Sequence, residues 1–514
     1  TPQGGAFGLP LLTLSPRYGK IDRLKNGKIS DFFILSSHSP VIMGISSLPK
    51  EVTCLEFLRS LYDIVSGLGS FLLIPVFFFL LGLASRAGVQ RSGQCALAVL
   101  GSSVGIQLLI SALGGRLVTV VNTMIDRYAL STGAANLHWQ VAADLTAGRE
   151  ILYWVLPAAV LINLLMLACR VTRVLNMDLW SLWQAAFVGV LVQQLTGILW
   201  MGLTAALLLF ILQVILADIF TAPVGRVLGT NHVTFTQSFA VGAAPLAWLV
   251  TFLLNKIPGL RDRHFSLEHT KRGGFLLEPA LWGLIAGIII GLAAGMSLYD
   301  TISFALVVAG CLFALPRLLR VFARAVGSVL DPIAEKNARR GRLPLNVAVN
   351  AVVGAANATS VLSAVILVPA AVVLAVVLPG NLVLPQGDIA MLLYLMIFIT
   401  ALSGGCLVRS LITGLIGIVA MLYSGTLLTY LFSAAAGAMD PTTYTVGQYN
   451  TLCNTANPLS LLFVEGTSFG LAGIAALAVL VLGIVFLAAR RLRRMTRRLA
   501  APSAPSPEAP AKEN

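Results

Sequence analysis

The segment SVLSAVILVPAAVVLAVVL, residues 360–378, is long and apolar enough to decide the class of fold. A helix of about 20 such residues crosses the hydrocarbon core of a bilayer, and runs of about 18 to 23 apolar residues recur from Val65 to Leu487. Of the 514 residues, 57% are hydrophobic and 11% are charged, and the mean hydropathy is +0.88. Soluble domains carry about 25% charged residues. The sequence therefore predicts an all-α polytopic membrane protein and excludes a soluble enzyme, a nucleic-acid-binding domain and a disulfide scaffold.

The apolar runs predict about eleven net crossings with a defined orientation. They are expected at residues 65–84, 94–113, 150–169, 180–219, 236–254, 276–296, 300–319, 360–378, 389–405, 410–430 and 468–488. The run 180–219 is too long for one span, and the positive-inside rule favours one span plus a hairpin or in-plane segment there. The basic loops 255–272 and 317–342 and the tail from Arg490 then lie in the cytoplasm. The N-terminus and the loop with His232 lie outside.

The two ends of the chain differ from its centre in composition. Residues 1–56 lack a sustained apolar run, so we expect a disordered N-terminal extension, in which Met43 is a candidate start. The end of the chain, 499–514, is rich in Pro, Ala and Ser and is expected to be a disordered tail. The transmembrane domain is predicted to occupy 57–498.

Two apolar segments, 346–360 and 451–466, are interrupted by Asn, Ser and Gly. Broken helices survive at membrane depth only inside protein or along a water-filled cavity, and a pair of them points to the central site of a transporter. The alternative is that both are polar loops joining spans. We favour re-entrant segments.

Amides and hydroxyls dominate the polar residues of the apolar runs, which suits a polyhydroxylated solute. Each could instead form an interhelical hydrogen bond worth about 0.6 kcal/mol. As a set, the following are predicted to bind solute hydroxyls: Gln193, Gln237, Asn350, Asn357, Asn457 and Ser460. Glu278 and Asp388 are predicted to be structural or gating carboxylates. Asn357 in particular is expected to have no structural role.

Several chemistries have no motif in this sequence. There is no GxxxxGK[ST] or HExxH, and no cluster of His and Cys at ligand spacing, so we predict no metal, no cofactor and no catalytic residue in this chain. The basic residues flank spans and do not form one patch, which argues against nucleic acid as a partner.

Ordered stretches of the chain resemble one transporter family. The stretches are LLMLACRVTRVLNMDLWSLW (164–183), NKIPGLRDRHFSLEH (255–269), LEPALWGLIAGIIIGLAAG (277–295), LPRLLRV with LDPIAEKNARR (315–340), PGNLVLPQGD (379–388), LVRSLITG (407–414) and NPLS (457–460). From about Phe57 to Arg498 the chain resembles galactitol-type phosphotransferase system (PTS) permeases, the membrane-embedded IIC component of the ascorbate/galactitol superfamily.

The resemblance implies import of a galactitol-like polyol across the bacterial inner membrane with concomitant phosphorylation. The phosphoryl group would come from a separate IIB protein supplied by IIA, so the enzyme status of this chain alone is left open. It also implies a homodimer with an elevator mechanism. Gln193, Gln237, Asn350 and Asn357 stand where galactitol members are expected to carry histidine or aspartate, and amides cannot accept a proton. The alternative is a secondary transporter or facilitator that moves the polyol unmodified.

Overall fold

The computed structural model describes residues 56, 59–60, 72–147, 149–229, 231–261, 278–444 and 448–500, all within the compact unit Cys54–Asn514. The predicted N-terminal extension before residue 56 and the predicted tail beyond residue 500 lie outside these residues. The described part of the unit consists of helices joined by loops and a few short strands.

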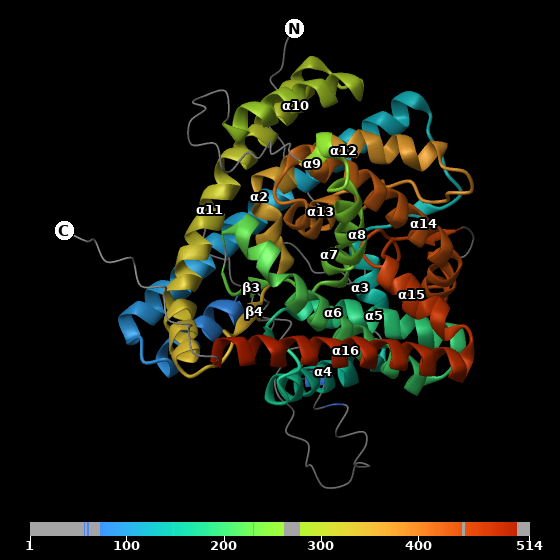
Figure 1. Ribbon diagram of the computed structural model, residues 1–514. Coiled ribbons are helices and arrows are strands. Elements are labelled where there is room, and N and C mark those ends of the chain that lie inside the picture. The colour runs from blue at the N-terminus through green and yellow to red at the C-terminus, as the bar shows by residue number, and fades with distance from the viewer. Residues whose placement is uncertain are drawn as a thin grey trace, which may run out of the picture. The chain divides into compact units, whose positions relative to one another are not determined.

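Helices make up most of the described chain (Figure 1). Seven are long and apolar enough to span a membrane: α2 (Val89–Tyr128), α4 (Glu150–Ala168), α6 (Leu199–Leu228), α11 (Leu298–Arg339), α12 (Ala358–Val377), α14 (Leu407–Met439) and α16 (Gly470–Ala500). Shorter helices are Leu72–Ala84, α3 (Trp139–Ala147), α5 (Leu179–Thr196), α7 (Ser238–Val241), α8 (Ala244–Leu254), α9 (Pro258–Arg261), α10 (Pro279–Ala293), α13 (Met391–Leu402) and α15 (Pro458–Thr467). The prediction of a helical, multi-pass membrane protein is confirmed.

Helices α2, α10 and α11 pack together along much of their length, and α11 and α2 run side by side in Figure 1. The face of α10 that meets α11 carries Gly283, Gly287 and Gly291 at four-residue spacing. A Cβ on Gly287 would lie 2.5 Å from the Cα of Ala305. Small residues at this spacing allow the backbones of two membrane helices to approach closely. We call α2, α10 and α11 the three-helix unit.

The run 180–219 is two helices, because α5 and α6 pack antiparallel around a turn at Gly197 (φ 72°). A Cβ on Gly202 of α6 would lie 2.5 Å from the carbonyl oxygen of Gly189 on α5. The 30 residues of α6 extend about 45 Å, enough for a complete crossing. By contrast the predicted span 236–254 is broken into α7, of four residues, and α8, of eleven. The chain therefore uses a helix pair where we expected one net span.

This difference changes the side of the membrane to which the loop with His232 is assigned. Its Nε2 lies 3.6 Å from a carboxylate oxygen of Asp331, within the segment 317–342 that was predicted to be cytoplasmic. Burial lowers the pKa of His232. The prediction that His232 and the 317–342 segment lie on opposite sides is wrong, because α6 returns the chain to the end from which α5 starts.

Short parallel strands pair the segments between helices at two places in the fold. In one, β2 (Val174–Asn176), β4 (Asn346–Ala348) and β3 (Val233–Thr234) pair in that order. In the other, β1 (Ala135–Asn136) pairs with β5 (Tyr449–Asn450), and a bridge joins Ala134 to Val383. After β4 the chain forms the short 3-10 helix η2 (Ala351–Ala356). The segments 346–360 and 450–457 are buried throughout, so they are interior breaks in the helices and not surface loops.

Candidate functional site

Polar residues stand at the N-terminal ends of several helices that follow these strands. The carboxylate of Asp178 caps α5 by accepting from the N–H of Trp180 (3.2 Å), and Gln237 stands at the start of α7. Asn350 caps η2 through the N–H of Val352 (2.9 Å), and Asn457 caps α15 through the N–H of Leu459 (3.0 Å). Asn and Asp favour such positions because the side chain satisfies an N–H that the helix leaves free. The strands thus bring several helix starts, with their polar caps, into the interior.

Three of these residues and three further polar residues form what is called here the central polar cluster: Asp178, Gln184, Gln237, Ser238, Asn454 and Asn457. The hydroxyl of Ser238 donates to Oε1 of Gln184 (2.9 Å), and the amide of Gln237 interacts with the carboxylate of Asp178. The end of α7 also approaches the start of α15, because a Cβ on Gly242, which follows α7, would lie 2.7 Å from Oδ1 of Asn457. Each of the six is no more than 4% exposed.

The cluster has unused hydrogen-bonding capacity. The atoms without a hydrogen-bond partner in the described part of the chain include Oδ2 of Asp178, both side-chain amide atoms of Asn454, Nδ2 of Asn457 and Oγ of Ser460. More than about nine in ten buried polar groups of native proteins are paired. Donors and acceptors left free together in the interior are suited to a ligand that offers several hydroxyls.

An aromatic group adjoins the cluster at the start of α5. The rings of Trp139, Trp180 and Trp183 meet edge to face, with centroids 4.8 Å apart for Trp139 and Trp180 and 5.2 Å apart for Trp180 and Trp183. The indole N–H of Trp183 is buried and free. Aromatic side chains supply apolar surface with one polar group, so this group can form an apolar side of the site.

The eight predicted residues lie in different parts of the structure. Gln237, Asn457 and Ser460 lie in or beside the cluster, whereas Gln193 is half-buried near the far end of α5. Asn350 is a helix cap. Asn357 is also structural, contrary to expectation: its Oδ1 accepts from the N–H of Ser360 (3.0 Å), and its Nδ2 donates to the carbonyl of Val227 (3.3 Å).

The two carboxylates have different positions. Asp388 is 3% exposed and accepts from the N–H of Trp139 (2.9 Å) and the hydroxyl of Thr451 (2.6 Å), so it ties together the loops around β1 and β5. Glu278 begins α10 and lies 3.3 Å from Arg317 in an exposed ion pair. Asp388 therefore joins loop segments, Glu278 pairs with α11 of the three-helix unit, and the choice between a structural and a gating role stays a prediction.

Sequence reasoning missed Asp178, Gln184 and Asn454. A signal for Asp178 exists, since Asp immediately before the apolar run LWSLW is a typical helix start. Gln184 is an amide in an apolar run, like the residues that were selected. Asn454 lies within the predicted broken segment and differs from its neighbour Asn457 only in its contacts, which the sequence does not specify.

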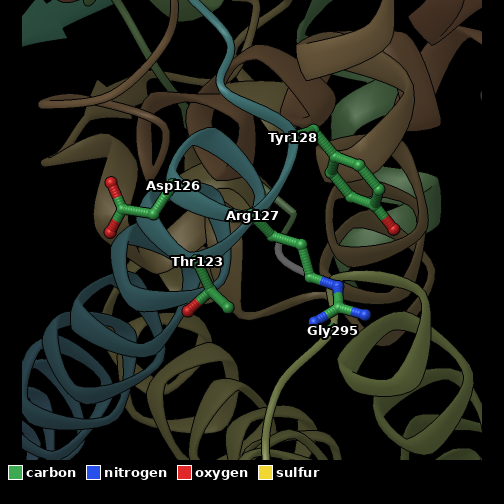
Figure 2. Close-up of a pocket in the computed structure, with 5 residues that line it drawn as sticks. All are labelled: Thr123, Asp126, Arg127, Tyr128 and Gly295. Carbon is green, nitrogen blue, oxygen red and sulfur yellow. The ribbon is translucent and has the colours of Figure 1, made fainter.

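A separate surface cavity of about 640 Å³ lies at the end of the three-helix unit. It is lined by Thr123, Asp126, Arg127, Tyr128 and Gly295. Figure 2 shows the side chains of Arg127 and Tyr128 reaching toward the helix beside Gly295, whereas Asp126 points the other way. The Tyr128 hydroxyl is already used by the carbonyl of Ala293 (2.8 Å). None of the predicted residues lines it, so we place the candidate site in the central polar cluster.

Comparison with known proteins gives the family of this chain. The profile of the EIIC-GAT family, described as a PTS system sugar-specific permease component, matches residues 63–446. The chain belongs to this family. The family resemblance inferred from the sequence is thereby confirmed.

Relatives of this PTS permease come from Escherichia coli. A protein of strain K12 assigned by inference as a permease IIC component is 26% identical over 379 residues, which cover 73% of this chain and 86% of the relative. The PTS system galactitol-specific EIIC component of strain K12 is 26% identical over 370 residues, or 70% of this chain and 80% of the relative. The galactitol-specific EIIC component of strain O157:H7 matches to the same extent.

Proposed function

We propose that this PTS permease imports a polyol, galactitol or a close relative, which is phosphorylated as it enters by a separate IIB protein. The observation that carries the proposal is the set of amide and carboxylate atoms of the central polar cluster, together with the hydroxyl of Ser460, that have no partner among the described residues. The galactitol-specific relatives support the choice of polyol. Of the predicted residues, Gln237, Asn457 and Ser460 are assigned to the solute, joined by Asp178, Gln184 and Asn454.

The chemical step needs a second protein. The phosphoryl group passes from a cysteine sulfur of IIB, which IIA recharges, to a substrate hydroxyl oxygen, and the hydroxyl proton ends on the departing cysteine thiolate or in water. The amides Gln237 and Asn457 cannot accept that proton. Phosphoryl transfer has a loose transition state in which positioning supplies most of the catalysis. The role of this chain is therefore to hold the hydroxyl where IIB can reach it.

The same proposal includes a membrane topology of about eleven crossings in the bacterial inner membrane. The helices assigned to cross are Leu72–Ala84, α2, α4, α5, α6, α10, α11, α12, α13, α14 and α16. The pair α7–α8 and the segment β5–α15 enter and return without crossing. The N-terminus lies outside and the C-terminus inside, which keeps Arg170, Arg173 and the Arg490 end cytoplasmic, as the positive-inside rule requires.

We also propose a homodimer that works as an elevator, with 57–498 as one transmembrane domain. The three-helix unit would be the fixed scaffold that meets the partner copy. The helices around the central polar cluster would move past it. The close glycine packing of α10 on α11 supports a rigid scaffold.

The test uses inverted membrane vesicles and intact cells with and without phosphorylated IIB. Labelled galactitol and a panel of hexitols and pentitols are supplied, and the internal label is resolved as free or phosphorylated. Phosphorylated product that depends on IIB is the expected result. Free label that accumulates regardless of IIB would contradict it and identify a facilitator on the same fold.

A further inference from the structure

The turn between α13 and α14 contains a buried arginine that has no counter-charge among the described residues. Arg409 is 7% exposed, and none of the salt bridges among the described residues includes it. Its Nη1 donates to Oδ1 of Asn255 (3.1 Å), while its Nε has no partner. A buried charge that is neither paired nor fully hydrogen-bonded is costly. The side chain is therefore expected to have an anionic partner when the protein works.

Several hydroxyl side chains, which can donate hydrogen bonds, lie close to Arg409 in the chain. The hydroxyls of Thr400, Ser403, Ser410 and Thr413 are fully buried and unpartnered in the described chain. Gly404 and Gly405 both have positive φ (68° and 73°), and a Cβ on Gly404 would lie 3.4 Å from Nη2 of Arg409. The turn thus folds back so that its backbone and the guanidinium approach closely.

The start of α14 adds further donors. This 33-residue helix begins at Cys406, and no side chain caps its first N–H groups. The first N–H groups of a long helix and its dipole favour an anion. Guanidinium, hydroxyls and uncapped N–H groups together match the oxygens of a phosphate.

Helix α13 connects this turn to the candidate solute site. Tyr394, near its start, lies within electrostatic range of Asp178 and Cys453. Ser403 follows its end, about 14 Å further along a helix. Under the proposed topology this end of α13 faces the cytoplasm, where phosphorylation takes place.

We propose that Thr400, Ser403, Arg409, Ser410 and the uncapped start of α14 bind a phosphate monoester dianion, the phosphoryl group of the polyol product. This assignment rests on the proposed function, because only a phosphorylating permease forms such a product here. Inorganic phosphate shares the chemistry and is a simple probe of the same site.

The experiment measures binding of radioactive inorganic phosphate to the purified protein in lipid nanodiscs, at constant ionic strength set with chloride. Wild type is expected to bind phosphate saturably, and glycerol 1-phosphate is expected to displace it. Arg409→Gln should weaken binding at least tenfold. Ser403→Ala with Ser410→Ala, which keeps Arg409 and its bond to Asn255, should weaken it several-fold if Arg409→Gln fails to fold. The matched control is Lys256→Gln, which removes an exposed cation next to Asn255 and should leave binding unchanged.

Three results would overturn the inference: no saturable phosphate binding by wild type, equal losses in Arg409→Gln and Lys256→Gln, or binding of inorganic phosphate that glycerol 1-phosphate does not displace. The separate assay of polyol phosphorylation distinguishes failure of the proposed function. If phosphate binds through Arg409 but no polyol is phosphorylated, the function is wrong and the anion site remains.

Discussion

Asn357 and Asn457 have the same residue type and the same capping position, yet the structure gives them different environments. Both accept a backbone N–H through Oδ1. The Nδ2 of Asn357 donates to the carbonyl of Val227, whereas the Nδ2 of Asn457 is buried and has no hydrogen-bond partner among the described residues. An aspartate at either position keeps the cap and replaces only the Nδ2 group.

We therefore predict opposite outcomes for Asn457→Asp and Asn357→Asp. Asn457→Asp should weaken polyol binding at least tenfold, because a carboxylate replaces the free Nδ2 donor while the helix cap through Oδ1 is kept. Asn357→Asp should lower stability by about 1–3 kcal/mol, since the carbonyl of Val227 loses its donor, and binding by the folded fraction should persist. Binding and melting of the purified variants measure both effects. Normal polyol binding by Asn457→Asp would exclude it from the site.

Gln193 and Gln184 provide a second comparison along one helix. Gln184 is held by Ser238 in the central polar cluster, while Gln193 lies half-buried toward the C-terminal end of α5. We predict that Gln184→Ala reduces uptake at least tenfold and that Gln193→Ala changes it less than twofold. Uptake of labelled polyol, normalised to membrane protein, is the measurement. A larger loss of uptake in Gln193→Ala would indicate that Gln193 belongs to the solute site.

At the scale of elements, the contact between α7 and α15 depends on a glycine. A Cβ at position 242 would lie 2.5 Å from the carbonyl oxygen of Ser238 and 2.7 Å from Oδ1 of Asn457. Gly310, on the exposed side of α11, has nothing within 4 Å of its added Cβ. We predict that Gly242→Ala abolishes uptake by separating the end of α7 from the start of α15. Gly310→Ala should be active and slightly more stable, because alanine favours a helix over glycine by about 0.5–1 kcal/mol. Active Gly242→Ala would show that this close approach of α7 and α15 is not required.

The membrane topology gives a second prediction at the scale of helices and loops. In a cysteine-free background, Asn231→Cys and Lys336→Cys should both be labelled by an impermeant maleimide only from the cytoplasmic side, because the neighbouring His232 and Asp331 lie 3.6 Å apart. Gln386→Cys, in the loop before α13, is the outer control. Labelling of position 231 from outside intact cells would contradict the structure and restore the arrangement expected from the sequence.

The sequence predicted the class of fold and the two broken segments because apolar length and interrupting polar residues are local properties. It could not predict that 180–219 forms two helices or that 236–254 is broken, since both runs are simply long and apolar. The difference depends on where α6 packs and on how β3 joins β2 and β4. In the same way, the amides at 357 and 457 look alike until Val227, distant in the chain, supplies a partner for one of them.

At the scale of the whole molecule, the proposed elevator requires the three-helix unit to slide past the helices around the central polar cluster. Gly114 of α2 and Ala390 before α13 face each other across this boundary, with 3.0 Å between the Cβ of Ala390 and a Cβ placed on Gly114. Disulfides join residues with Cβ atoms about 3.5–4.5 Å apart, so a small relaxation is enough for Gly114→Cys with Ala390→Cys to form one.

Locking this boundary should stop the transport cycle without destroying the solute site. In a cysteine-free background, we predict that oxidation of the double variant abolishes uptake, that a reductant restores it, and that purified oxidised protein still binds polyol. Each single cysteine variant is the control and should be unaffected by oxidant. If the cross-linked protein transports at the wild-type rate, α2 and the start of α13 move as one body. The moving part must then be sought within the helices that surround the cluster, in α7–α8 or α15.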